Sequence, residues 1–297
     1  MNYVLTGGAG NITRPLAQQL IEAGHSVKII GRNAMNLQDL VLKGAVAVTG
    51  SVEDPEFLAN SFKDADAVYT MVPPYFGAAD WKAWIGNIGK NYADAIKLAG
   101  VQKVVNLSSI GAHLAEGCGP VSGLYRVEQE LNQLVNVDIV HLRPAFFYYN
   151  HLSNIPMIKS AGITGGNYGK GTNLPMVAPV DIAHTAADYL NNLSFTGKRA
   201  VYVVSDTKTT HEIAQILGKA IGIPELPWID FTDEQLLGGL LSAGLPEEVA
   251  ANYVEMGSAI RNGKMVADYQ QNTTQIHKGS IRFEEFAERD FNTAFKG

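Results

Sequence analysis

The sequence contains a single cysteine, Cys118, and little charge of either sign. One cysteine excludes internal disulfides and a cysteine-rich zinc site, and the seven histidines show no metal-binding spacing such as H-E-x-x-H, so we expect no metal. With 23 Lys and Arg against 29 Asp and Glu, the formal net charge is −6, and no long basic run is present. Nucleic acid is therefore disfavoured as a direct partner.

Long apolar segments are also lacking. No window approaches the roughly 18 uninterrupted apolar residues that a membrane-spanning helix requires. The N-terminus enters a strand pattern at once, Asn2-Tyr3-Val4-Leu5, without the basic region and apolar stretch of a signal peptide. We therefore expect a cytoplasmic protein, monomeric or homodimeric, with no membrane partner.

What the sequence does have is a regular alternation of short apolar runs and helical patterns in its first half. The expected strands span residues 3–5, 27–30, 45–48, 67–71, 103–107 and 138–142. Helical patterns lie between them, at about residues 14–23, 36–42, 55–62, 79–99 and 123–134. Continuous apolar strands of this kind suit a parallel sheet that is buried on both faces. The pattern predicts an α/β fold with a doubly wound parallel sheet of the Rossmann type.

The second half is less regular. A glycine-rich stretch over residues 161–171 predicts an extended loop or hairpin, and a helix over 180–193 leads to a strand over 200–204 at a late edge of the sheet. From residue 209 onward the pattern is mainly helical, with Thr209, Thr232 and Ser280 near the expected helix starts. We expect a dinucleotide-binding domain of residues 1–150, completed by 176–205, and a smaller, mainly helical, substrate-side lobe of residues 151–175 and 206–297.

A glycine-rich turn joins the first expected strand to the first helix. Its spacing, Gly7-x-x-Gly10-x-x-Thr13, is the G-x-x-G-x-x-G form with threonine in the third position. Gly7 can make the tight turn, Gly10 removes a Cβ that would block phosphates, and the helix N-terminus offers free N–H groups to an anion. Because the turn stands at the first strand-to-helix junction, it favours cofactor binding over a merely structural turn.

The end of the second expected strand bears on which nicotinamide cofactor binds. An acid there would bind the ribose 2′-hydroxyl of NAD(H), but the sequence reads Ile30-Gly31-Arg32-Asn33. Arg32 can pair a 2′-phosphate bidentately, so NADP(H) is preferred and NAD(H) remains possible. The alternative for Arg32 is a solvated surface arginine, and Arg14 is a weaker phosphate candidate. We expect the cofactor to contact Thr6, Gly7, Gly10, Asn11, Ile12, Arg32, Ser51, Met71, Val72, Pro73 and Ser108.

The glycine turn, Arg32, the Ser108-Ser109 pair and the motif Leu142-Arg143-Pro144 together resemble the NmrA-like family, atypical members of the short-chain dehydrogenase/reductase superfamily. The resemblance extends over nearly the whole chain, through residues 127–131, 145–150, 180–183 and 283–287. It implies either an NAD(P)H-dependent reductase of quinones or dyes or a cofactor-sensing protein without chemistry of its own.

Ordinary enzymes of that superfamily use a Ser with Tyr-x-x-x-Lys, where the lysine lowers the pKa of the tyrosine. The counterpart here is Tyr125, and Gln129 stands where the lysine would be. The catalytic candidates are therefore Ser109, as a hydrogen-bond donor, and Tyr125, as a proton relay. The alternative is that Tyr125 only packs on its helix.

Aromatic residues follow two of the expected strands, in Tyr75-Phe76 and in the run from Phe146 to Tyr149. Such runs usually belong to a core. Both runs nevertheless begin at the carboxyl edge of the sheet, which is where open α/β sheets bind ligands. We expect Tyr75, Phe76, Phe146 and Phe147 to contact a small-molecule substrate.

Two functions stay open from the sequence. The first is an NADP(H)-dependent reductase that delivers hydride to a planar apolar acceptor such as a quinone. The second is a non-catalytic redox sensor, whose protein partner recognises the NADP-bound or empty form. A third, a sugar-nucleotide epimerase, is disfavoured because that chemistry needs the Tyr and the Lys together.

Overall fold

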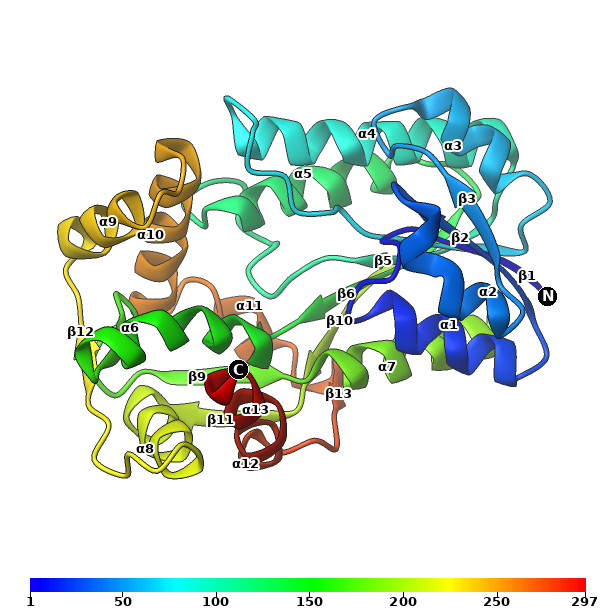
Figure 1. Ribbon diagram of the computed structural model, residues 1–297. Coiled ribbons are helices and arrows are strands. Elements are labelled where there is room, and N and C mark those ends of the chain that lie inside the picture. Colours follow the sequence, from blue (N-terminus) through cyan, green and yellow to red (C-terminus); the bar gives the residue numbers. More distant parts are fainter.

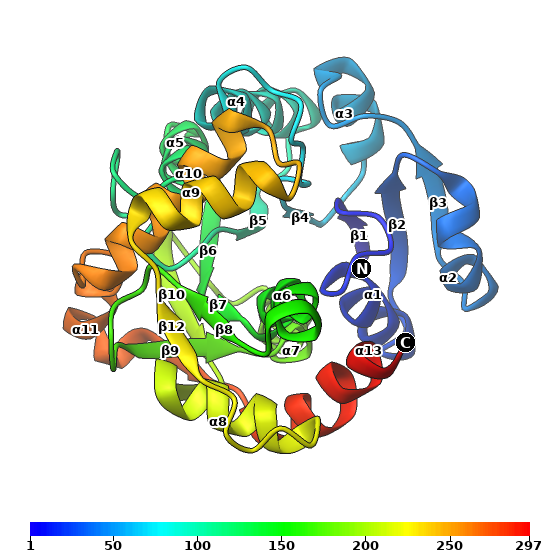
Figure 2. The ribbon, with the colours of Figure 1, turned by 60° about the vertical axis from the view of Figure 1, so that its left-hand side comes forward.

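The computed structural model describes residues 1–297, except for the side chain of Thr273. Its main sheet has eight strands, β1 (Asn2–Leu5), β2 (Ser26–Gly31), β3 (Val46–Thr49), β4 (Ala67–Thr70), β5 (Lys103–Leu107), β6 (Asp138–Pro144), β10 (Lys198–Val204) and β13 (Ile276–Lys278). All neighbouring pairs are parallel, in the order β13-β10-β6-β5-β4-β1-β2-β3 (Figure 1 and Figure 2). The expected doubly wound parallel sheet is thus confirmed.

Helices cover both faces of this sheet (Figure 1). One face packs on α1 (Thr13–Glu22), α2 (Gln38–Leu42) and α7 (Pro179–Asn192), and the other on α3 (Pro55–Phe62), α4 (Trp81–Ala99) and α5 (Pro120–Asn132). Successive strand residues alternate between the two faces: Tyr3 and Leu5 join the α1–α7 core, whereas Val4 joins the α3–α5 core. Because both faces are buried, the strands read as nearly continuous apolar runs.

The strand order reverses between β1 and β4, because β2 and β3 follow on one side of β1, whereas β4, β5 and β6 follow on the other side. In open α/β sheets, ligands bind outside the carboxyl ends of the strands at such a switch point. The glycine turn after β1 lies at this point, so the fold places it where a dinucleotide would bind.

The late part of the sheet differs from the expectation. The strand predicted at residues 200–204 is present as β10, but it is not at the edge, because β13 pairs with its outer side through Tyr202 and Ile276. The C-terminal region thus contributes a strand to the main sheet. Its three residues are too short to stand out against the surrounding helical pattern.

The remaining elements lie beyond the carboxyl edge of the main sheet (Figure 2). Two small sheets consist of β7 (Phe146–Phe147) with β9 (Asn173–Val177) and β11 (Asp206–Thr209), and of β8 (Thr164–Gly166) with β12 (Trp228–Asp230). The helices are α6 (Ile155–Ala161), α8 (Thr210–Ala220), α9 (Asp233–Ser242), α10 (Glu247–Arg261), α11 (Ala267–Gln271), α12 (Phe283–Phe286) and α13 (Asn292–Lys296). Apart from α9, which has no buried residue, these helices share a second apolar core that includes Tyr148, Ile213 and Phe283.

Local signals explain several boundaries. Thr209 and Thr232 cap α8 and α9 in complete capping boxes with Glu212 and Gln235, as their positions predict. Ser280 lies three residues before α12 but is not its N-cap, which is Arg282; the N–H and the hydroxyl of Ser280 both donate to the buried carboxylate of Asp181. The glycine-rich stretch forms β8, which pairs with the distant β12 and not within a hairpin.

Asp181 joins three parts of the chain. From the first turn of α7 it accepts hydrogen bonds from Ser205 Oγ (2.6 Å), Ser280 N (3.1 Å) and Ile281 N (3.2 Å). A Cβ at Gly279 would lie 2.2 Å from Asp181 Oδ2, so only glycine fits there. This carboxylate therefore fastens the end of β13 to α7 and β10.

Within the described residues, no helix is both long and apolar enough to cross a membrane.

We predict that His151 makes stability depend on pH. Its ring is 2% exposed and lies between Phe146 and Phe283, each at a centroid distance of 5.3 Å. Burial lowers its pKa from 6.5 to about 3. Below pH ~6.5 the unfolded chain binds a proton that folded His151 does not, so stability falls as the pH drops. For this residue the free energy of unfolding should fall by about 2 kcal/mol between pH 7 and pH 5.

Urea denaturation across this pH range measures the effect. His151→Phe should flatten the profile, while His211→Gln, an exposed histidine on α8, should retain its slope. Equal slopes for wild type and His151→Phe would contradict the prediction.

Candidate functional site

The glycine turn has the geometry of an anion cradle. Gly7 has a φ of +97°, and a Cβ there would lie 2.6 Å from Thr13 Oγ1 and 2.8 Å from Met71 Cγ. A Cβ at Gly10 would lie 3.2 Å from the Gly7 carbonyl oxygen. Thr13, in the third motif position, donates its hydroxyl to the Thr6 carbonyl at 3.0 Å, which closes the turn. The first helix therefore begins directly beside the turn.

The N-terminus of α1 has no side-chain cap. Among the described residues, the backbone N–H groups of Asn11, Ile12 and Thr13 donate to no protein acceptor. Uncapped N–H groups at a helix N-terminus attract an anion through both hydrogen bonding and the helix dipole. The residues present thus fit the pyrophosphate of a dinucleotide.

Thr6 and Met71 hold the turn against the loop after β4. The buried Thr6 hydroxyl accepts from Met71 N at 2.9 Å, and Tyr92 on α4 donates to the Met71 carbonyl at 2.6 Å. The side chain of Thr6 is therefore used internally and can only position the turn. Val72 and Pro73 follow Met71 at the carboxyl edge, partly exposed.

Arg32 directly follows β2 and is exposed, and it forms no ion pair among the described residues. Gly31, which precedes it, lies against the turn, because a Cβ at Gly31 would lie 3.4 Å from Gly8 Cα. Arg14, the weaker phosphate candidate, pairs with Asp39 of α2 instead. The structure thus leaves Arg32 as the available cation beside the turn.

The loop after β3, residues 50–54, closes the same side of the site. Gly50 N donates to the Gly31 carbonyl at 3.1 Å, which fixes this loop to the end of β2. On the other side, Trp84 Nε1 donates to Glu53 Oε1 at 2.9 Å and Asn91 Nδ2 to the Val52 carbonyl at 3.2 Å, so the loop is also fixed to α4. Ser51 is partly exposed and accepts from Glu53 N at 3.2 Å.

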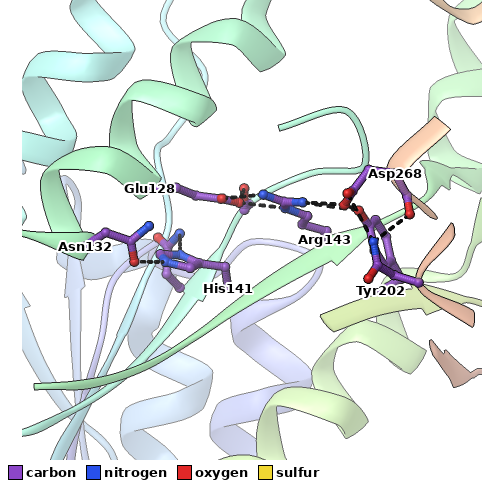
Figure 3. Close-up of polar contacts among 9 residues, drawn as sticks. Glu128, Asn132, His141, Arg143, Tyr202 and Asp268 are labelled. Carbon is purple, nitrogen blue, oxygen red and sulfur yellow. Dashed lines mark hydrogen bonds and ion pairs between the residues drawn. The ribbon is translucent and has the colours of Figure 1, made fainter. Parts of the chain in front are cut away.

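Ser108 belongs to a buried ionic network that the sequence did not indicate. Figure 3 shows the Glu128, Arg143, Tyr202 and Asp268 members of this network. Its hydroxyl donates to Glu128 Oε1 at 2.5 Å, and Glu128 accepts from Arg143 Nε (3.0 Å) and Nη2 (2.7 Å). Arg143 Nη1 also donates to Asp268 Oδ2 at 2.9 Å and to the Tyr202 hydroxyl at 3.1 Å. The proton of Ser108 is therefore directed at Glu128 and not at a ligand.

Burial by itself would lower the pKa of Arg143, but the hydrogen bonds with Glu128 and Tyr202 outweigh burial, and the net pKa is raised. The signal in the sequence was an arginine inside an apolar strand, Leu142-Arg143-Pro144, since a buried charge requires a partner. The partners themselves lie 15 and 125 residues away, so no local pattern identifies them.

A second polar chain crosses the same face of the sheet. Thr70 Oγ1 donates to Asn106 Oδ1 at 2.9 Å, and Asn106 Nδ2 lies 3.1 Å from His141 Nδ1. Because an amide nitrogen only donates, Nδ1 accepts, and Nε2–H donates to Asn132 Oδ1 at 3.1 Å (Figure 3). His141 is thus held neutral, in agreement with its pKa, which burial lowers.

The two catalytic candidates are Tyr125 on α5 and Ser109, which follows β5. Tyr125 is half-buried on α5 and makes no hydrogen bond among the described residues, while Gln129, one turn further on, is exposed. Ser109 is partly exposed, and its hydroxyl donates to the Ile110 carbonyl at 3.0 Å. No cation lies at position 129 to assist Tyr125, and Ser109 keeps a hydroxyl at the edge of the sheet.

The two aromatic runs divide between core and surface. Phe146 is 8% exposed against His151 and Tyr168, so it belongs to the second core, whereas Phe147 keeps a partly exposed ring. Tyr75 and Phe76 are each 43% exposed. The expectation that such runs usually belong to a core is thus met by Phe146.

Cys118 is buried, and burial raises the pKa of its thiol to about 12, so it is unreactive.

Comparisons with known proteins agree with this geometry. The family model described as the NmrA-like family matches residues 3–287. A curated relative, the (4-alkanoyl-5-oxo-2,5-dihydrofuran-3-yl)methyl phosphate reductase of Streptomyces griseus, is 25% identical over 88% of this chain and 87% of its own.

Two solved structures have the same fold. The NADPH-dependent quinone oxidoreductase QOR2 of Escherichia coli, complexed with NADPH, superimposes with a TM-score of 0.83 at 19% identity, over 98% of this chain and 100% of that chain. The Citrobacter sp. triphenylmethane reductase complexed with NADP(H) gives 0.81 at 21% identity, over 97% and 99%.

Arg32 predicts how strongly the two nicotinamide cofactors bind. Arg32→Ala should weaken NADPH binding about tenfold or more, because it removes a charged hydrogen bond to the 2′-phosphate, and should leave NADH binding nearly unchanged. Isothermal titration calorimetry measures both dissociation constants. Lys43→Ala, which removes an exposed cation after α2, is the matched control and should change neither. Equal losses for NADPH and NADH in Arg32→Ala would refute the assignment.

Proposed function

The chain belongs to the NmrA-like family, and we propose that it is a reductase that transfers hydride from NADPH to a planar, apolar acceptor such as a quinone. The observation that carries the proposal is the uncapped N-terminus of α1 behind Gly7 and Gly10, with Arg32 exposed beside it. When bound there, NADPH would supply the hydride. The chain's own residues hold the pyrophosphate at Asn11 and Ile12 and the 2′-phosphate at Arg32.

The residues on and near α5 offer no strong acid to protonate a reduced substrate, which favours an acceptor that needs none. Reduction of an aliphatic carbonyl leaves an alkoxide, which a tyrosine activated by lysine would protonate. Here Gln129 replaces the lysine, and the hydroxyl of Ser108 is bound to Glu128. A quinone spreads the charge over a conjugated ring, takes one proton from solvent and leaves as a hydroquinone. Ser109 lies partly exposed at this edge, and its hydroxyl would donate a hydrogen bond to the quinone oxygen after turning away from the Ile110 carbonyl, to which it now donates at 3.0 Å.

The names of the similar proteins support a reductase. One relative is described as a phosphate-ester reductase, and the two structural neighbours as reductases of quinones and triphenylmethane dyes, which are both conjugated acceptors. We assign the acceptor to the β6 side of the site, where Phe147 has a partly exposed ring that can stack on a flat molecule.

We predict measurable NADPH oxidation with small quinones and little with aliphatic aldehydes or ketones, because the latter gain less from stacking and need an acid. The assay is anaerobic mixing with NADPH and a panel of quinones, azo dyes and aldehydes, followed at the absorbance of NADPH. Tight NADPH binding without oxidation of any member would overturn the reductase proposal in favour of a redox sensor.

The same assay locates the acceptor. Phe147→Ala should raise the quinone KM strongly and leave the dissociation constant of NADPH unchanged, since the exposed part of the ring, which otherwise packs on the first core, would contact the acceptor and not the cofactor. An unchanged KM in a variant that melts like wild type would contradict this placement.

Tyr125 provides a separate prediction. Without a lysine at position 129, Tyr125→Phe should keep most of the turnover with quinones, because the phenol has no electrostatic help toward proton transfer. Steady-state kcat is the measurement. A loss of about a thousandfold, the upper part of the range for a general acid, would show that another cation activates Tyr125.

A further inference from the structure

The loop after β4, residues 73–80, carries two exposed aromatic rings that lie against different partners. Tyr75 lies 5.0 Å from the Trp84 ring at an interplanar angle of 41°, and Phe76 lies edge-on, 5.4 Å from Trp81. Trp81 in turn contacts Tyr253 on α10 at 5.6 Å. Phe76 is thus connected through Trp81 to the C-terminal helix α10, whereas Tyr75 contacts Trp84.

Trp84 contacts the loop after β3. Its indole Nε1 donates to Glu53 Oε1 at 2.9 Å, and one residue earlier the Val52 carbonyl accepts from Asn91 of the same helix. The other end of this loop is bound to β2 through Gly50 N and the Gly31 carbonyl. Tyr75 is therefore connected through Trp84 to Glu53, and the same loop is bound through Gly50 to Gly31, the residue before Arg32.

The end of β2 would lie beside the adenosine half of a bound dinucleotide. In a dinucleotide-binding fold, the residue at this position contacts the ribose 2′ group of the adenosine, and the pyrophosphate crosses the N-terminus of the first helix. The adenosine then lies over β2 and β3, and the nicotinamide over the other half of the sheet. Tyr75 is thus connected, through Trp84 and the loop after β3, to the adenosine half of the site.

We propose that Tyr75 and Trp84 form the aromatic wall of an adenine subsite, with the exposed part of the Tyr75 ring stacked on the purine base. This rests on the proposed binding of NADPH and reassigns Tyr75 from the acceptor to the cofactor. Trp84 supports the Tyr75 ring and Glu53 fixes the indole of Trp84, so the wall stands in place before the nucleotide arrives. Aromatic rings stack on a base through its π-face, which tolerates a small rotation of the ring.

The ligand 2′,5′-ADP tests this directly, because it contains the adenine, the ribose and the 2′-phosphate but no nicotinamide. Tyr75→Ala should raise its dissociation constant about tenfold, measured by isothermal titration calorimetry, which is the typical loss of one base–aromatic stack. Tyr75→Phe keeps the ring and should stay within about twofold of wild type. Phe76→Ala is the matched control, since Phe76 has the same 43% exposure in the same loop but lies against Trp81.

Three results would overturn the proposal. The first is an unchanged dissociation constant in Tyr75→Ala. The second is an equal loss in Tyr75→Ala and Phe76→Ala, which would indicate a general effect of the loop. The third is a raised quinone KM in Tyr75→Ala with normal 2′,5′-ADP binding, which would return Tyr75 to the acceptor.

The assay also separates this inference from the proposed function. Wild-type protein that binds 2′,5′-ADP through Tyr75 but oxidises no NADPH would refute the reductase and support the adenine subsite. Failure of wild type to bind 2′,5′-ADP at all would refute both the NADPH assignment and the subsite.

Discussion

Arg143 carries a positive charge into the interior next to the carboxyl edge of the sheet, and much of the surrounding structure compensates for that charge. Glu128 of α5 binds it bidentately, and Tyr202 and Asp268 complete its hydrogen bonds from β10 and α11. Removing one partner of a buried ion pair typically costs about 3–5 kcal/mol, because the other charge stays unpaired. The arrangement of β6, α5, β10 and the C-terminal segment is therefore linked at one residue. The same network takes the proton of Ser108, so an interaction that stabilises the fold also limits the chemistry at the site.

The polar layer of Thr6, Thr70, Asn106, Ser108, His141 and Arg143 lies on the α4–α5 face of the sheet, near the carboxyl ends of its strands. Its side chains are satisfied by one another and by the helices above. A ligand at the edge would therefore meet backbone N–H groups, the hydroxyl of Ser109 and aromatic rings more than free charges, with Arg32 as the exception. This suits a reaction whose chemistry comes from a bound cofactor and whose acceptor needs orientation more than acid catalysis.

Burial separates residues that look alike in the sequence. Phe146 and Phe147 are neighbours on one short strand, but their side chains point to opposite sides, so one fills the second core and the other keeps a partly exposed ring. Tyr75 and Phe76 are neighbours as well, and they lie against two tryptophans that are one helical turn apart on α4. In each pair both residues are aromatic, and only the direction of each side chain distinguishes the role of one residue from that of its neighbour.

The sequence by itself determined the doubly wound sheet, the glycine turn after β1 and the helix starts at Thr209 and Thr232, because these depend on periodicity, on the absence of a Cβ and on hydrogen bonds within a few residues. It also indicated the family, through motifs that are each a few residues long, although the set of motifs extends over nearly the whole chain. The tertiary structure alone decided which partners compensate Arg143, that β13 forms the edge of the sheet, that Ser280 binds Asp181 and that Trp84 connects Tyr75 to the β3 loop. Each of these joins residues far apart in the chain, and their pairing depends on how the helices and strands pack, which no local pattern encodes.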